Sequence, residues 1–126
     1  MPFDDRTPHL ELQADGETFR LLKPVRWTPR ANFAIRHDLP PGPLRVPAGF
    51  VTDFASVPRL FRSLVPRAGR YSLATFVHDW LYRAQPEGWT RKKADLAFLS
   101  AMRDLGVPWL KRRTIYHAVR IGGGRW

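Results

Sequence analysis

The first half of the chain alternates apolar and polar positions over short stretches. Residues 10–13 alternate in period two, Asp15 and Gly16 form a turn dipeptide, and residues 18–27 resume an extended apolar and basic pattern. Alternation in period two on both sides of such a turn is typical of paired strands. The pattern therefore predicts a β-hairpin near the start of the chain.

Two further short strands are predicted before residue 50. Residues 32–36 and 44–46 each carry a short extended pattern. Between them, residues 39–43 contain several prolines and a glycine, which force a turn because proline fixes φ and removes a backbone donor. In this interpretation the first fifty residues consist of strands and loops.

After residue 55 the apolar residues recur every three and four positions, which is the period of a helix. About four helices are predicted, over residues 57–65, 71–83, 91–105 and 108–121. Ser56 and Thr90 are placed to cap the first and the third helix, and Gly106 is placed to end the third.

The order of these elements predicts the fold class. Strands followed by helices are typical of an α+β domain with segregated layers. A length of 126 residues favours a single domain over residues 1–126, in which residues 1–50 are mainly β and loop and residues 51–126 are mainly helical.

The predicted helix over residues 71–83 carries an unusual polar strip. Thr75, His78, Asp79 and Tyr82 lie three and four residues apart, so they share one face, away from the apolar side of the helix. An imidazole, a carboxylate and a phenol are thereby brought together. These residue types at this spacing are candidates for a catalytic site.

Asp95 on the next predicted helix lies at the edge of the apolar stripe. A carboxylate turned toward a core is costly unless it is paired, so Asp95 needs a partner, and His78 or Tyr82 on the neighbouring helix is the expected one. Such a contact would orient the imidazole as behind a catalytic base. Alternatively, Asp95 bonds Arg91 or caps a buried backbone group, and its role is structural.

The loop before the first predicted helix holds another candidate. Asp53 supplies a hard oxygen ligand, and carbonyls of its loop could complete a calcium site together with Asp79. The alternative is that Asp53 and Ser56 cap the amides of the following helix.

The amino-acid composition excludes some kinds of site and favours some kinds of partner. The chain has no cysteine, which excludes a disulfide scaffold, a thiol nucleophile and cysteine-ligated metal centres. The formal net charge of +10 favours an anionic partner, whether a membrane surface, nucleic acid or an acidic protein. No apolar run is long enough to span a bilayer, and the acidic start does not resemble a signal peptide.

The last predicted helix carries the densest basic cluster. Lys111, Arg112, Arg113 and Arg120 are candidates for contact with a polyanion or a partner, and Trp126 for insertion into a partner's groove. A nucleic acid is the less favoured partner, because such clusters are more often solvated faces or contacts to an acidic neighbour.

Four segments together resemble an uncharacterised domain family of tailed phages and prophages, over about residues 40 to 122. They are residues 46–59 (VPAGFVTDFASVPR), 78–82 (HDWLY), 91–98 and 106–109 (GVPW). The resemblance implies a phage or prophage gene product, located in the virion or the host cytoplasm. A tail or tail-tip component that contacts other virion proteins is the expected role.

A more distant resemblance involves the polar strip. His78, Asp79 and Tyr82 on one helix, followed by Asp95 and Phe98 on the next, resemble the core of secreted phospholipase A2 of the bacterial type. This resemblance implies an antiparallel helix pair in which His78 is the general base that activates water against a lipid ester. Tyr82 and Asp95 would then orient His78.

The same resemblance implies a metal. Asp79 would bind Ca²⁺, with Asp53 and the carbonyl of Phe54 as an upstream calcium loop. Where the phospholipases have cysteines around the His-Asp pair, this chain has Ala74, Thr75 and Leu81. The sequence thus leaves open a calcium-dependent esterase acting on bacterial membrane lipid, a virion component that keeps only the helical core, and a basic nucleic-acid-binding protein.

Overall fold

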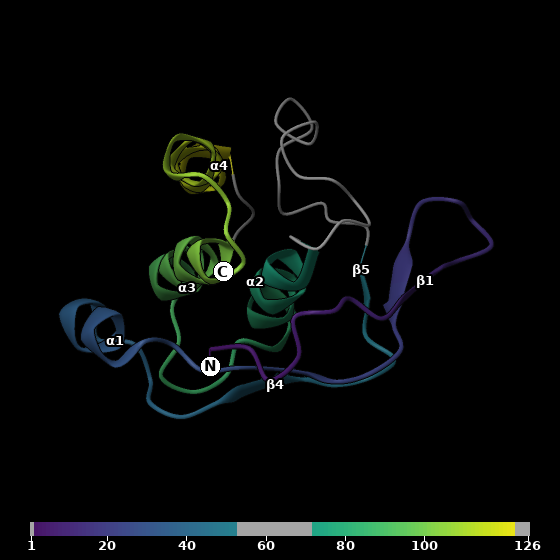
Figure 1. Ribbon diagram of the computed structural model, residues 1–126, viewed down its shortest axis with the longest axis horizontal. Helices are drawn as coiled ribbons and strands as arrows, with labels where there is room; N and C mark the ends of the chain where they lie inside the picture. Colours follow the sequence, from purple (N-terminus) through teal and green to yellow (C-terminus); the bar gives the residue numbers. More distant parts are fainter. Residues whose placement is uncertain (1, 53–71, 123–126) are drawn as a thin grey trace.

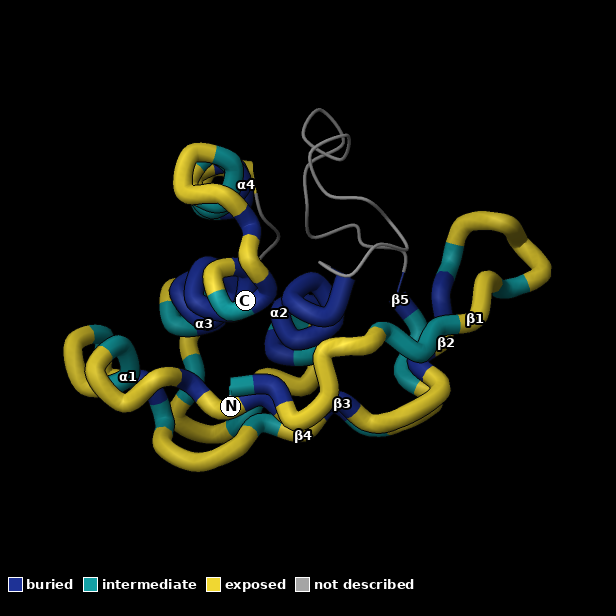
Figure 2. Tube along the Cα trace, in the orientation of Figure 1, coloured by how far each residue is buried: buried dark blue, intermediate teal, exposed yellow. Residues whose placement is uncertain are grey.

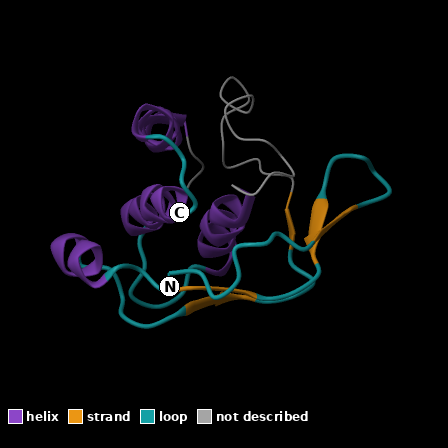
Figure 3. Ribbon diagram, viewed as in Figure 1, coloured by secondary structure: helices purple, strands orange, loops and turns teal. Residues whose placement is uncertain are grey.

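The structure is a computed structural model that describes residues 2–52 and 72–122. Within these residues, strands come first and helices follow, as expected for an α+β fold (Figures 1 and 3). The elements in chain order are β1 (Leu10–Leu12), β2 (Phe19–Leu21), β3 (Val25–Trp27), α1 (Ala31–His37), β4 (Leu44–Val46), β5 (Val51–Thr52), α2 (Ser72–Ala84), α3 (Arg91–Asp104) and α4 (Trp109–Gly122).

The predicted hairpin is confirmed between β1 and β2. The two strands pair antiparallel, with Glu11 opposite Arg20, and Asp15 closes the connection by accepting hydrogen bonds at 2.9 Å from the amides of Glu17 and Thr18. Gly16 has a φ of 73°, a left-handed conformation that glycine adopts without strain. Asp15 and Gly16 therefore form the turn of the hairpin, as predicted.

The prediction of one extended stretch over residues 18–27 is wrong in its continuity. The stretch divides at Pro24 into β2 and β3, which belong to different antiparallel sheets. The first sheet has the order β1-β2-β5, and the second pairs β3 with the predicted strand β4. Proline has no backbone N–H to donate to a neighbouring strand, so a continuous strand through it would lose a hydrogen bond of the ladder.

A second correction concerns residues 32–36, which form the helix α1 and not a strand. Five residues are too few to separate the two periods. In the helix Phe33 and His37 lie one turn apart with ring centroids at 4.4 Å. The helix ends at His37, and the left-handed conformation of Asp38 that follows, with a φ of 55°, turns the chain so that the amide of Leu39 donates to the carbonyl of Ala34 at 2.9 Å.

The predicted helices over residues 71–83, 91–105 and 108–121 correspond to α2, α3 and α4. The hydroxyl of Thr90 caps α3 by accepting from the amide of Lys93 at 3.2 Å. Gly106 follows α3 with a φ of 86°, as its predicted role in ending the helix requires. The predicted helix over residues 57–65 and its cap Ser56 lie outside the described residues.

The core lies around α2, which packs against the β3-β4 sheet on one side and against the neighbouring helix α3 on another (Figure 1). Figure 2 shows α2 and α3 as mostly buried. The polar strip is expected to lie away from the apolar side of this helix. It is nevertheless not exposed to solvent, because Thr75 and His78 have no exposed surface. A helix covered on both sides buries its polar positions as well as its apolar ones.

The sheet is fastened to α3 through the buried Trp27. Its indole nitrogen donates to Asp104 at 2.9 Å, and the guanidinium of Arg30 reaches the same carboxylate at 2.6 Å. This contact holds the end of α3 against the β3-β4 layer. None of the described helices combines the length and the apolar character that crossing a membrane requires.

Candidate functional site

The centre of the candidate site is Asp95 on α3, a carboxylate with no exposed surface. One of its oxygens lies 2.7 Å from Nε2 of His78 and accepts from the hydroxyl of Tyr82 at 2.5 Å. The other accepts from the guanidinium of Arg120 at 2.8 Å. We call these four residues the His78 cluster; it joins α2, α3 and α4.

The contact expected for Asp95 therefore forms, and it forms with both of the expected partners. The alternative partner, Arg91, instead donates at 2.9 Å to the carbonyls of Val119 and Arg120 near the end of α4. That contact holds the last turn of α4 over the cluster and brings Arg120 within reach of Asp95.

Electrostatics within the cluster favour an ionised Asp95. Burial alone raises the pKa of this carboxyl group, but the hydrogen bonds from His78, Tyr82 and Arg120 outweigh burial and hold the pKa below its usual value. Burial and the bond to Asp95 raise the pKa of Tyr82, so the phenol stays protonated and donates. Because an ionised carboxylate only accepts, the proton of His78 that faces it is on Nε2.

The imidazole of His78 is enclosed by rings. Phe98 stacks on it with centroids at 4.4 Å and planes at 18°, and Tyr82 lies at 4.4 Å with planes at 50°. The side chain of His78 has no exposed surface. Ring contacts on two sides and the bond to Asp95 therefore fix its orientation.

Asp79 is nearly buried and links α2 to the first sheet. Its carboxylate accepts a hydrogen bond from the hydroxyl of Thr52 on β5 and lies 4.0 Å from Nδ1 of His78. Its predicted role as a calcium ligand stays a prediction, because Asp53 and Phe54, the other predicted ligands, lie outside the described residues. Within residues 2–52 and 72–122, no three His, Asp or Glu side chains are grouped to hold a metal ion.

Two buried hydroxyls on α2, that of Thr75 in the polar strip and that of Ser72 one turn before it, have no hydrogen-bond partner within the described residues. Groups of this kind are rare in folded proteins and often mark places where water, an ion or a ligand binds.

The residues of the predicted basic cluster on α4 have different environments in the structure. Arg120 is bonded to Asp95, and Arg112 donates to the carbonyl of Val107 at 3.0 Å, whereas Arg113 is exposed. Lys111 is half-buried and has contacts of its own. Trp126 lies outside the described residues. The role of Arg120 in the cluster was missed from the sequence, because its place on Asp95 depends on how α4 packs against α3.

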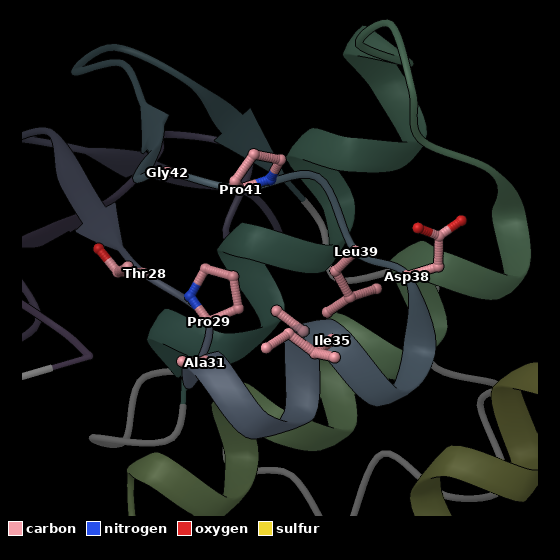
Figure 4. A pocket seen from close by; sticks show the side chains of 9 residues that line it. Thr28, Pro29, Ala31, Ile35, Asp38, Leu39, Pro41 and Gly42 are labelled. Carbon is pink, nitrogen blue, oxygen red and sulfur yellow. The ribbon is translucent and has the colours of Figure 1, made fainter.

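An apolar cavity of about 540 Å³ lies beside α1, away from the His78 cluster. Figure 4 shows Pro29, Ile35 and Leu39 around it, with Pro41 on the opposite wall. None of its lining residues comes from α2, α3 or α4. The cavity is therefore not part of the candidate site.

Comparison with known proteins identifies a family. Residues 27–119 match the family described as "Protein of unknown function (DUF1353)", and this range contains the whole His78 cluster except Arg120. An 83-residue stretch, 64% of this chain, is 35% identical to the uncharacterized protein y4jT of Sinorhizobium fredii (strain NBRC 101917 / NGR234). The match covers 24% of that relative, so the chain spans only a fraction of its length. No solved structure matches significantly.

Proposed function

The chain belongs to the DUF1353 family of unknown function, and we propose that it is a non-catalytic component of a phage or prophage virion, at the tail or its tip. The observation that carries the proposal is the complete burial of His78 within its cluster. A general base needs access to water and substrate, whereas an enclosed imidazole that bonds a buried carboxylate is suited to holding helices together.

The arrangement around Asp95 supports the structural role. Its oxygens accept from His78, Tyr82 and Arg120, so the carboxylate of one helix is bonded to both neighbouring helices. Removing one partner of a buried pair of this kind leaves a charge without compensation. The cluster is therefore expected to stabilise the fold.

Support for the virion setting comes from the sequence segments that resemble a tailed-phage domain family. Three of those segments, residues 78–82, 91–98 and 106–109, fall on α2, on α3 and at the start of α4. Three of the four segments that carry the resemblance thus lie on or directly before the helices that the His78 cluster joins. A helical core whose His78 and Asp95 side chains are fully buried fits a protein whose task is assembly.

The proposal is tested by a hydrolysis assay. The purified chain is incubated with vesicles of phosphatidylethanolamine and phosphatidylglycerol, with Ca²⁺ or with a chelator, and released fatty acid is measured. We expect no release from the wild type and none from His78→Gln, and no shift of the melting temperature on adding Ca²⁺. Calcium-dependent release by the wild type that is lost in His78→Gln would overturn the non-catalytic proposal.

The virion setting has its own test. Particles are purified from a host that carries the gene and are searched for the chain by mass spectrometry. We expect the chain at a fixed ratio to other particle proteins. Its absence from intact particles, with the chain present in the host lysate, would contradict this part of the proposal.

A calcium-dependent esterase is the second candidate, and a specific geometry favours it. His78 is bonded through Nε2 to Asp95, which also holds Tyr82, while Nδ1 faces Asp79 at 4.0 Å. In such an enzyme His78 takes a proton from water at Nδ1 and Asp95 stabilises the imidazolium. Asp79 would hold Ca²⁺, which polarises an ester carbonyl when bound. The vesicle assay decides between the two candidates.

A further inference from the structure

A second cavity, of about 370 Å³, lies between α1, α3 and α4. Figure 1 shows α3 between the other two helices. The basic residues that line the cavity come from all three helices: Arg36, His37, Lys92, Arg103 and Arg113. Among the described residues, none of those that line it is acidic. The cavity is therefore strongly positive and lies apart from the His78 cluster, whose residues do not line it.

The cavity is built from one face of each helix. On α3, Lys92, Leu96, Leu99 and Arg103 follow one another at helical spacing. The two leucines are almost fully buried, with 8% and 7% of their surface exposed, and form an apolar floor. Lys92 and Arg103 are exposed at the two ends of this row. Cationic groups thus surround an apolar base.

The positive charges lack compensation nearby. Within the described part of the chain, no carboxylate lies within 4.0 Å of the charged groups of Arg36, Lys92, Arg103 or Arg113, whereas Lys93 on the same helix pairs with Asp38 at 3.5 Å. Burial lowers the pKa of the remaining basic group, His37, and so does the positive charge of Arg36, Lys92 and Arg113. Four cations are thus held around one hollow although they repel one another.

We propose that this cavity binds the phosphate group of a phosphate monoester. Arginine presents a planar fork of donors that matches phosphate oxygens, and Arg36, Arg103 and Arg113 surround the hollow. The aromatic rings of Phe33 and Tyr116 line the same cavity and supply surface for the organic part of the ligand. The volume lies in the range of small-molecule sites.

The shape favours a compact ligand over a nucleic-acid backbone. The cations converge on one hollow between three helices, whereas proteins that track a nucleic-acid strand arrange theirs along a groove. A phosphate monoester carries up to two negative charges on one group, which suits convergent cations. Its source is either a soluble ester or a lipid headgroup, since both present the same chemistry.

Binding is tested with the whole chain and defined probes. Adenosine 5′-monophosphate and adenosine are titrated separately by calorimetry, and vesicles of phosphatidylcholine with and without phosphatidic acid are tested by co-sedimentation. The variant Arg36→Gln with Arg113→Gln removes two cavity charges. The matched control is Arg20→Gln with Arg45→Gln, which removes two exposed charges from the strands.

We expect the monophosphate or the phosphatidic acid vesicles to bind, and adenosine and pure phosphatidylcholine not to bind. Each guanidinium removed from the cavity should weaken binding about tenfold, as for a hydrogen bond to a charged group. The control variant should bind as the wild type does. Binding to the nucleotide identifies a soluble ester, and binding to the vesicles alone identifies a lipid headgroup.

Three results would overturn the proposal. The first is that neither probe binds at millimolar concentration. The second is an equal loss of binding in the cavity and control variants, which would show a response to net charge only. The third is binding of a single-stranded oligonucleotide without binding of either monoester probe, which would identify a nucleic-acid surface instead.

Discussion

The two sides of α3 hold charge in opposite ways. Toward α2 and the end of α4, Asp95 is fully buried and every oxygen is bonded to a neighbouring side chain. Toward α1 and the middle of α4, Lys92 and Arg103 are exposed beside a hollow that is lined by no acidic side chain from residues 2–52 and 72–122. One helix of 14 residues thus separates a compensated carboxylate from uncompensated cations.

This difference separates groups that stabilise the fold from groups that are available to a ligand. A buried charge is retained only where its partners are in place, because desolvation is costly. Exposed cations that face one another without a counterion contribute little to stability. We therefore expect substitutions in the His78 cluster to cause large losses of stability and substitutions around the basic cavity to cause small ones.

The largest effect is expected for Asp95→Ala. It leaves His78 and Arg120 without their common acceptor, and we expect a loss of about 3–5 kcal/mol in the free energy of unfolding. Urea denaturation measures this loss. Asp4→Ala, at an exposed carboxylate 3.5 Å from Arg26, is the control and should change little. Equal losses in both variants would contradict the assigned role of Asp95.

The stability that Asp95 contributes should depend on pH. Its pKa is lower in the folded chain than in the unfolded one, so its ionised form contributes stability above the unfolded value of about 4. That contribution is lost as the pH falls through the folded pKa. Stability curves of the wild type and Asp95→Asn should therefore lie apart at neutral pH and converge in acid. A constant separation down to the lowest pH would contradict the assignment.

The smallest stability effect is expected at the basic cavity. Arg36→Gln with Arg113→Gln removes two exposed cations that have no carboxylate partner among the described residues, and the free energy of unfolding should change by less than about 0.5 kcal/mol. The same urea measurement applies. A loss of several kcal/mol would show that the cavity cations support the fold and that the two sides of α3 do not differ as described.

Local signals predicted much of the fold. Thr90 and Gly106 act on residues next to them in the chain, so their roles at the ends of α3 could be recognised from the sequence. The short stretch over residues 32–36 could not be assigned correctly, because five residues fit either period. The division at Pro24 shows the same limit, since strand partners are chosen by distant segments.

In the candidate site, too, contacts between neighbouring segments could be predicted from the sequence and contacts with distant segments could not. His78 and Tyr82 share one helix face, and the carboxylate of Asp95 on the next helix needs a partner when it is buried. Their contact with Asp95 could therefore be predicted from the sequence. Arg120 reaches Asp95 from a third helix, and the basic cavity needs faces from α1, α3 and α4 at once. No spacing rule within one segment predicts such convergence.

The free energy of unfolding of His78→Ala, measured by urea denaturation, tests most directly whether the His78 cluster stabilises the fold. Because the imidazole is buried and bonded to Asp95, we expect a loss of about 3 kcal/mol or more. Catalytic residues are often retained at a cost in stability, and replacing one commonly leaves stability unchanged or raises it. A His78→Ala chain as stable as the wild type, or more stable, would contradict the structural role of the cluster.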